Sequence, residues 1–360
     1  MNPDYPDRPK SDFPLAGTPH TRVGEDQRIE EVNSQRMLTP QLEPLTLAAI
    51  LDEFGIDPIL QGEKESYQIL GYISHSPQAA VFYGRGLRSN REVAIKKVSN
   101  REQLEQEKYI QGLLKSRGVT LKSKGGNRQI LLADEFLDEP AVVVTRYFKF
   151  GDLREFIKTS YKAESTPGEE DFPPRVIIPT PYQTRALIHG ACTGLQYVHD
   201  CNVVLRDVKS RNMVLDANPA LKKLALENLH RVTLRFLDFE TGYDMISGHG
   251  YVPKKMVGTT YYMSPEAIRG KRQTPQSDIY SLGAVIYEVL TGKRPFEEEE
   301  TVVEAVFQKH LHERVPDMIQ SNPAVGKDLQ RLVEKAMAKD PRNRHQTAAE
   351  LWRHYAMLLR

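Results

Sequence analysis

Residues 204 to 216 read Val-Leu-Arg-Asp-Val-Lys-Ser-Arg-Asn-Met-Val-Leu-Asp. Asp207, Lys209 and Asn212 lie in this stretch between two apolar runs that favour short buried strands. A carboxylate, an ammonium group and an amide held in this way suit phosphoryl transfer, in which they accept the attacking hydroxyl's proton, neutralise the moving phosphoryl and help to hold Mg²⁺. Without context, a polar turn between two strands explains the stretch equally well, so the rest of the chain has to decide.

The 360-residue chain is long enough for one large two-lobed domain or two smaller units. Its 49 basic and 48 acidic side chains nearly cancel, so no overall electrostatic field favours nucleic acid or a membrane surface. No apolar run approaches the roughly 20 residues that cross a bilayer, and the first residues lack a signal-peptide pattern. Cys192 and Cys201 are too few for a disulfide framework and are expected in a helix or at its end. We therefore expect a soluble, cytoplasmic protein.

The first 65 residues differ in character from the rest. Residues 1 to about 40 are rich in polar residues, Pro and Gly, and carry too few apolar side chains to offset the entropy lost on ordering, so they are predicted to be disordered. Apolar residues at helical spacing then predict a short helix over 45–54 that ends at Gly55. This helix is expected either to dock on the following domain or to bind a regulatory partner.

From residue 67 the apolar pattern becomes strand-like. It predicts five strands, the first three in an antiparallel meander, at 67–73, 80–84, 92–98, 130–133 and 141–148. In the third strand Lys96 shares a face with Ala94, because side chains alternate between the two faces of a sheet. A lysine on an apolar face requires an anionic partner unless it lies at a solvated strand end.

Six short motifs occur in an order that resembles the eukaryotic-type (Hanks-type) serine/threonine protein kinase superfamily. Val93-Ala94-Ile95-Lys96 is identical to the family's lysine motif, and the stretch from residue 204 resembles its catalytic loop, with Leu205 where the family has histidine. Asp238-Phe239 resembles the metal-binding D-F-G motif, although Glu240 replaces the glycine. Residues 258–266 resemble the end of the family's activation segment.

This resemblance implies an α+β fold with the two lobes of a protein kinase. The N-lobe is expected at about residues 66–148, with an antiparallel β-sheet and one helix over 100–115, and the mostly helical C-lobe at about 149–360. A hinge is expected near residue 148, and residues 1–65 are expected to form an N-terminal extension. Two stretches look like insertions relative to the family, one near 161–181 and one near 217–232.

The resemblance also implies roles for individual side chains. Asp207 would be the catalytic base, Lys209 would stabilise the transferring phosphoryl, and Asn212 and Asp238 would hold Mg²⁺. Lys96 would set the ATP phosphates together with a glutamate of the helix over 100–115. Of the two candidates on this helix, Glu107 is favoured by the core spacing of the apolar residues that follow it, and Glu105 remains open. The remaining expected ATP contacts are Ile73, Ser74, Ser76, Ala79, Val81, Ala94, Thr145, Arg146, Phe148 and Val214.

The expected phosphate loop departs from the family pattern. Ser74, Ser76 and Ala79 stand where the family has glycines, and Val81 stands at the end of the motif. Small side chains still let backbone amides approach phosphates, but a positive φ becomes costly.

Other residues are expected to support the site. By the same resemblance, Thr259 contacts the catalytic Asp and Lys, Glu266 pairs with Arg344, and Asp278 anchors the backbone of the catalytic loop. Arg206 suggests control by phosphorylation, because an arginine there can bind a phosphorylated residue of the activation segment. The candidate phosphorylation sites are Ser247, Tyr251 and Thr260.

Two functions remain open at this point. The first is a serine/threonine kinase that uses Mg-ATP to phosphorylate proteins, since Lys209 and the residues 258–259 match the serine/threonine versions of their motifs. The second is a pseudokinase or nucleotide-binding scaffold, which the replacements at Ser74, Ser76, Leu205, Gln111 and Glu240 favour. All the charged catalytic groups are present, which favours the enzyme. Phosphorylation of a small molecule is disfavoured by the intact segment at 258–266.

Overall fold

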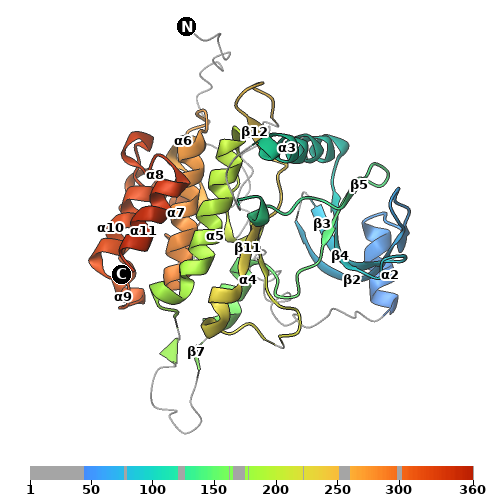
Figure 1. Cartoon of the computed structure of the whole chain (residues 1–360), viewed down its shortest axis with the longest axis horizontal. Helices are drawn as coiled ribbons and strands as arrows, with labels where there is room; N and C mark the ends of the chain where they lie inside the picture. The colour runs from blue at the N-terminus through green and yellow to red at the C-terminus, as the bar shows by residue number, and fades with distance from the viewer. Residues whose placement is uncertain are drawn as a thin grey trace. The chain divides into compact units, whose positions relative to one another are not determined.

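A computed structural model of the chain describes residues 44–76, 79–120, 126–161, 163–164, 175–176, 178–221, 223–250, 260–297 and 302–359. These residues form an antiparallel sheet and a mostly helical part, as expected for the α+β fold (Figure 1). The predictions for residues 1–43, Tyr251 and Thr259 lie outside the described residues.

Within the described ranges the sheet has six strands in the order β1-β2-β3-β4-β6-β5, all paired antiparallel. The strands are β1 (Ile59–Leu60), β2 (Tyr67–Ser76), β3 (Ala79–Gly86), β4 (Glu92–Val98), β5 (Glu135–Leu137) and β6 (Val142–Arg146). The predicted meander is confirmed by β2, β3 and β4. The strand predicted at 130–133 is wrong, because the edge strand is β5 and the apolar Ile130 is instead buried in the core of the helical part, bridged to Phe236.

The two faces of the sheet bury different side chains. Val93 and Ile95 of β4 belong to an apolar core that helix α2 (Pro44–Glu53) closes from outside. Ala94 and Lys96 lie on the opposite face and are only partly buried. Lys96 therefore shares a face with Ala94 as predicted, but the more deeply buried face is the one that α2 covers.

Helix α2 is part of the packing of the sheet. Leu51 is buried, and Phe54 lies edge-on to Phe82 of β3 with 6.0 Å between ring centroids. The helix ends at Glu53, and Gly55 follows with a φ of +54°, which suits a residue without a Cβ. Leu60 of β1 lies in the same core. One side of the sheet is therefore completed by residues that precede residue 66.

Helix α3 (Arg101–Thr120) is longer than the predicted helix over 100–115. The Oδ1 of Asn100 caps it by accepting a hydrogen bond from the backbone N–H three residues later, at 2.9 Å. Leu104 packs against the sheet, while Ile110 and Leu114 belong to the core of the helical part. This helix therefore contacts both parts of the fold.

The helical part is organised around α7 (Pro275–Thr291) and α5 (Pro181–Asp200) (Figure 1). Every residue of α7 from 277 to 291 is buried, and Gly292 ends the helix with a φ of +78°. Thr180 and Gln183 form a capping box at the start of α5. The other helices are α4 (Leu153–Ser160), α6 (Pro265–Ile268), α8 (Val303–His312), α9 (Met318–Ser321), α10 (Lys327–Ala336) and α11 (Ala348–Met357), with 3₁₀ turns η1 (Gly126–Gln129), η2 (Ser210–Asn212), η3 (Leu226–Arg231), η4 (Thr260–Tyr262) and η5 (Pro341–Asn343).

Short strand pairs form in the segments that connect these helices. They are β7 (Ala163–Glu164) with β8 (Arg175–Val176), β9 (Val203–Val204) with β12 (Tyr243–Asp244), and β10 (Met213–Asp216) with β11 (Thr233–Phe236). The strands β9 and β10 flank the loop from residue 205, as its two apolar runs predict. The charged stretch near 217–232 contains η3, and it buries Leu224, Leu229 and Val232 in the core rather than leaving them in solvent.

The structure also bears on the two cysteines and on membrane-spanning segments. Cys192 lies in α5 and Cys201 at its C-cap, as predicted, and both side chains are buried. In the part of the chain that the structure describes, no helix is both long and apolar enough to cross a membrane.

Candidate active site

Lys96 of β4 lies at the centre of three carboxylates. Its Nζ is 2.7 Å from Oδ1 of Asp238, 3.2 Å from Oε2 of Glu240 and 3.4 Å from Oε2 of Glu107. The sheet contributes the lysine, α3 contributes Glu107, and the segment after β11 contributes the other two. Chain segments more than a hundred residues apart in sequence thus meet at one ammonium group.

The electrostatics of this cluster follow from its burial. Burial alone would lower the pKa of Lys96, but the three carboxylates outweigh it and hold that pKa well above its usual range. Burial, reinforced by the charge of Asp238, raises the pKa of Glu240 to about 7. Burial opposes ionisation of Asp238, but Lys96 outweighs it and lowers the pKa of that carboxyl. The Lys96–Asp238 pair is therefore ionised at neutral pH, while Glu240 is only partly so.

The partner of Lys96 on α3 is Glu107. Glu105, the alternative that the sequence left open, points to solvent with a side chain 54% exposed and pairs with Lys108 at 3.3 Å. Gln111 holds Glu107 in place: its Nε2 donates to Oε1 of Glu107 at 3.0 Å, and its Oε1 accepts from the backbone N of Ala133 at 2.6 Å. The polar residue that departs from the family pattern is therefore a buried support for the glutamate.

Asp207, Lys209 and Asn212 form a second group. The Nζ of Lys209 lies 2.7 Å from Oδ2 of Asp207, and Nδ2 of Asn212 donates to the same oxygen at 3.1 Å and to the backbone O of Asp207 at 3.0 Å. Burial would lower the pKa of Lys209, but the carboxylate of Asp207 outweighs it and raises that pKa. The side-chain nitrogen of Asn212 thus donates to Asp207, and its side-chain oxygen is the atom that can bind a metal ion.

Asp278 anchors the backbone of this loop, as the sequence predicts. Its two carboxylate oxygens accept hydrogen bonds from the backbone N of Leu205 and of Arg206, each at 2.8 Å. Arg206 has a φ of +66°, a strained value for a residue with a Cβ, so these bonds help to hold an unfavourable backbone conformation. Leu205, which replaces the family's histidine, is buried in the apolar core.

A backbone hydrogen bond joins the two groups. The N–H of Leu237 donates to the carbonyl O of Asn212 at 3.0 Å, so the residue just before Asp238 is tied to the catalytic loop. Asp238 itself has a φ of +68°. The charge of Lys209 also contributes to lowering the pKa of Asp238, which places the two groups in one electrostatic site.

Residues 69–356 match the family model described as the protein kinase domain. This chain belongs to the protein kinase family. The two-lobed kinase fold expected from the order of the motifs is confirmed.

Curated relatives agree with this assignment. The serine/threonine-protein kinase PknB of Mycobacterium leprae is 34% identical over 172 residues, which cover 48% of this chain and 25% of that protein. The serine/threonine-protein kinase PrkC of Bacillus subtilis is 26% identical over 287 residues, which cover 79% of this chain and 39% of that protein. The chain therefore spans well under half the length of either relative.

The kinase motif that ends the activation segment is built into the helical part. Arg344 is 2% exposed and pairs with Glu266 through two contacts of 2.7 and 2.8 Å, as the sequence predicts. The hydroxyl of Tyr262 donates to Glu288 of α7 at 2.6 Å and lies 2.9 Å from Oγ of Ser210 in the catalytic loop. A small pocket beside Asp207 is lined in part by Tyr262 and Met263.

The expected nucleotide contacts lie on the strands around Lys96. Ser76 pairs with Ala79 and Ser74 with Val81, and Val81 in turn pairs with Lys96 on the next strand. Ile73 lies at a register shift between Tyr72 and Ser74. The glycine-poor phosphate loop is therefore a β-hairpin that stays paired up to residues 76 and 79, with a register shift at residue 73. Of the remaining contacts, Ala94 pairs with Thr145, Val214 lies in β10, and Arg146 and Phe148 line a pocket at the predicted hinge.

Contacts that hold α3 against the segment after Asp238 were not predicted. Both terminal guanidinium nitrogens of Arg117 bind Asp244 of β12, at 2.6 and 2.8 Å, and Tyr109 donates to the same carboxylate at 3.0 Å. Burial would raise the pKa of Asp244, but Arg117 outweighs it and lowers that pKa. Ser247 also donates to Asp244 at 2.6 Å. No spacing pattern in the sequence predicts a pair 127 residues apart.

Arg206, which suggested control by phosphorylation, is held by backbone oxygens. Its Nε donates to the carbonyl of Thr241 at 2.7 Å and its terminal nitrogen to the carbonyl of Gly242 at 3.3 Å. The guanidinium also lies 5.3 Å from the ring centroid of Tyr243. Binding of a phosphorylated residue by Arg206 stays a prediction.

Proposed function

We propose that this protein is a serine/threonine protein kinase, which transfers the γ-phosphoryl group of Mg-ATP to Ser and Thr hydroxyls of protein substrates. The observation that carries the proposal is the convergence of Lys96, Glu107 and Asp238 beside the group formed by Asp207 and Lys209. The relatives named serine/threonine-protein kinases support the choice of substrate hydroxyl. We also propose that residues 66–360 form the kinase domain and residues 1–65 an N-terminal extension.

Each charged residue has a role that its contacts allow. Asp207 orients the substrate hydroxyl and accepts its proton, and its carboxylate lies beside the pocket that contains Tyr262 and Met263. Lys209, at 2.7 Å from Asp207, keeps a positive charge where the phosphoryl group moves. Lys96, held by Glu107, presents a second positive charge from the sheet. These groups supply positioning and charge, which are the main needs of phosphoryl transfer.

The donor set also fits Mg²⁺. The carboxylate of Asp238 and the side-chain oxygen of Asn212 are hard oxygen ligands of the kind that Mg²⁺ prefers. The backbone hydrogen bond from Leu237 to Asn212 holds Asp238, the next residue, close to Asn212. When bound, Mg-ATP supplies the phosphoryl group and part of the charge neutralisation. Asp238 and Asn212 would hold the metal, and Lys96 would bind the phosphates.

Phosphorylation assays on the 360-residue chain test this function. Wild type and Asp207→Asn are incubated with radiolabelled Mg-ATP and a generic protein substrate, with Glu227→Gln, an exposed glutamate of η3, as the matched control. Because removing a general base costs about 10²- to 10⁴-fold, Asp207→Asn should lose at least about 99% of the incorporation, while Glu227→Gln keeps it. The label should be on Ser and Thr. Equal incorporation by wild type and Asp207→Asn, or none by wild type, would support a scaffold instead.

A further inference from the structure

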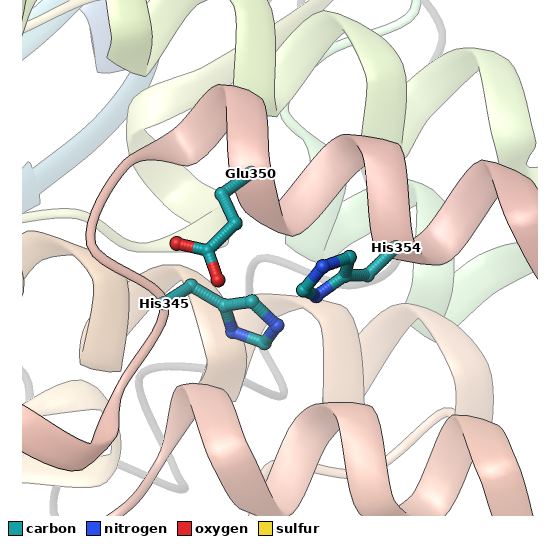
Figure 2. A group of neighbouring side chains, drawn as sticks. All are labelled: His345, Glu350 and His354. Atoms are coloured by element: carbon teal, nitrogen blue, oxygen red, sulfur yellow. The ribbon is translucent and has the colours of Figure 1, made fainter.

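A cluster of two histidines and a glutamate lies in the helical part, away from the catalytic residues. Glu350 and His354 are four residues apart on α11, and His345 lies in the loop that precedes this helix. Figure 2 shows the carboxylate of Glu350 and the rings of His345 and His354 gathered around one place. One nitrogen or oxygen atom from each residue lies within 4.8 Å of the others. The spacing of Glu350 and His354 puts both on one face of the helix.

His345 is the unusual member of the cluster. Its side chain is 1% exposed, and neither Nδ1 nor Nε2 has a hydrogen-bond partner among the described residues. A buried imidazole ordinarily donates from one nitrogen and accepts at the other, so leaving both without partners costs free energy. The ring of His354 does not satisfy it, since the two ring centroids are 5.2 Å apart and the planes are tilted by 60°. A cation between the rings and the carboxylate would give one nitrogen of His345 a partner.

We propose that His345, Glu350 and His354 bind one Zn²⁺ ion. Two imidazole nitrogens and one carboxylate oxygen are a donor set that zinc uses with three protein ligands, and a water molecule completes the tetrahedron. Mg²⁺ prefers an all-oxygen shell, so this site selects against the ion that serves ATP. Ligands of a tetrahedral zinc lie roughly 3.4 Å apart, so the cluster closes by about 1 Å on binding. Glu350 and His354 are only partly buried, so their side chains have more room to adjust than the ring of His345.

The surroundings of Glu350 both support and oppose the metal. Its Oε2 accepts a hydrogen bond from the backbone N of Gln346 at 2.7 Å, which fixes the carboxylate near His345. Its Oε1 lies 3.0 Å from Nζ of Lys335, a competing cation whose side chain is 42% exposed. Replacing Lys335 by glutamine removes a positive charge beside the site. Zinc affinity should then rise about fivefold to tenfold.

The site has a structural consequence for the kinase fold. His345 directly follows Arg344, whose guanidinium binds Glu266 at the end of the activation segment. Zinc would tie α11 to the loop that carries this arginine. Because a ligand that binds only the folded state stabilises it, Zn²⁺ should raise the Tm of the chain.

Metal titrations test the proposal on the untagged 360-residue chain after treatment with a chelator. All variants carry Asp238→Asn, which weakens metal binding at the ATP site. Zn²⁺ binding is measured by calorimetry, and Co²⁺ serves as a probe because a tetrahedral site gives it strong visible absorption. The parent, which carries Asp238→Asn alone, should bind one Zn²⁺ ion and become coloured with Co²⁺. Adding His354→Gln should abolish the colour and weaken Zn²⁺ binding at least about tenfold. His312→Gln, an exposed histidine at the end of α8, is the matched control and should behave as the parent.

Two further measurements guard against misfolding of a variant. The Tm without metal should be the same for His354→Gln and its parent, and only the parent should gain Tm with Zn²⁺. Lys335→Gln keeps all three ligands and should bind more tightly, which a merely structural role of the cluster would not produce. A parent that takes up no Zn²⁺ at micromolar free metal, or a folded His354→Gln that binds as tightly as the parent, overturns the proposal.

Discussion

Replacing Glu240 by glutamine tests the electrostatics around Lys96. The carboxylates of Glu107, Asp238 and Glu240 share one ammonium group, so ionising all three leaves an excess of negative charge in a buried place. Burial, with the added charge of Asp238, raises the pKa of Glu240 from 4.5 to about 7. Glutamine has nearly the same shape and does not titrate, so the substitution removes this ionisation and little else.

The expected effect is a change in stability with pH. A carboxyl whose pKa is higher in the folded state binds more protons there than in the unfolded chain, so stability falls as pH rises between the two pKa values. For a shift from 4.5 to about 7, the free energy of unfolding falls by about 2.5 kcal/mol between pH 5 and pH 8.5. The difference in free energy of unfolding, Glu240→Gln minus wild type, should therefore grow by about that amount over this range. It should level off above about pH 8.

Urea unfolding at pH 5, 7 and 8.5 measures this difference. Far-UV circular dichroism is the appropriate signal, because the single tryptophan, Trp352, lies on α11 and would miss unfolding of the sheet. Glu227→Gln, at an exposed glutamate, is the matched control for replacing a carboxylate by an amide. If the Glu240→Gln difference stays constant to within about 0.5 kcal/mol, Glu240 titrates as an ordinary surface carboxyl and the reasoning fails.

Two more substitutions test contacts of the site. Gln111→Leu removes the amide that positions Glu107, so kcat/KM should fall about tenfold to a hundredfold in steady-state assays, and an unchanged value would show that Glu107 holds its place unaided. Arg344→Ala leaves the buried Glu266 without its cationic partner and should destabilise the fold by about 3–5 kcal/mol in urea unfolding. The matched change Arg331→Ala, in an exposed pair with Asp328, should cost less than about 1 kcal/mol, and similar losses from both would contradict the argument.

The sequence predicted the site where a motif fixes both residue type and order. Lys96, Asp207 and Asp238 each stand in a recognisable short motif, and the structure brings them together. The glutamate that pairs with Lys96 was narrowed to two candidates, because helical spacing restricts which side chains can face the core. The pattern could not choose between them, since that choice depends on how α3 is rotated against the sheet.

Features that depend on tertiary neighbours were beyond the sequence. From the sequence, Gln111 was a departure from the family pattern that favoured the pseudokinase. Its supporting role could not be predicted, because its second hydrogen-bond partner is the backbone of Ala133, 22 residues away. The prediction of a strand at 130–133 was wrong because an apolar run does not indicate whether the core of the sheet or the core of the helical part buries it. The unpaired nitrogens of His345 are visible only once burial is known.

The packing of α2 on the sheet determines where a truncated fragment of this protein should begin. The family match begins at residue 69, and a shortened version cut there would lose Leu51, Phe54 and Leu60. Phe82 and its neighbours would then face water on an open hydrophobic surface, which promotes aggregation. A minimal soluble catalytic fragment should therefore start before residue 44, well upstream of the limit that family similarity suggests.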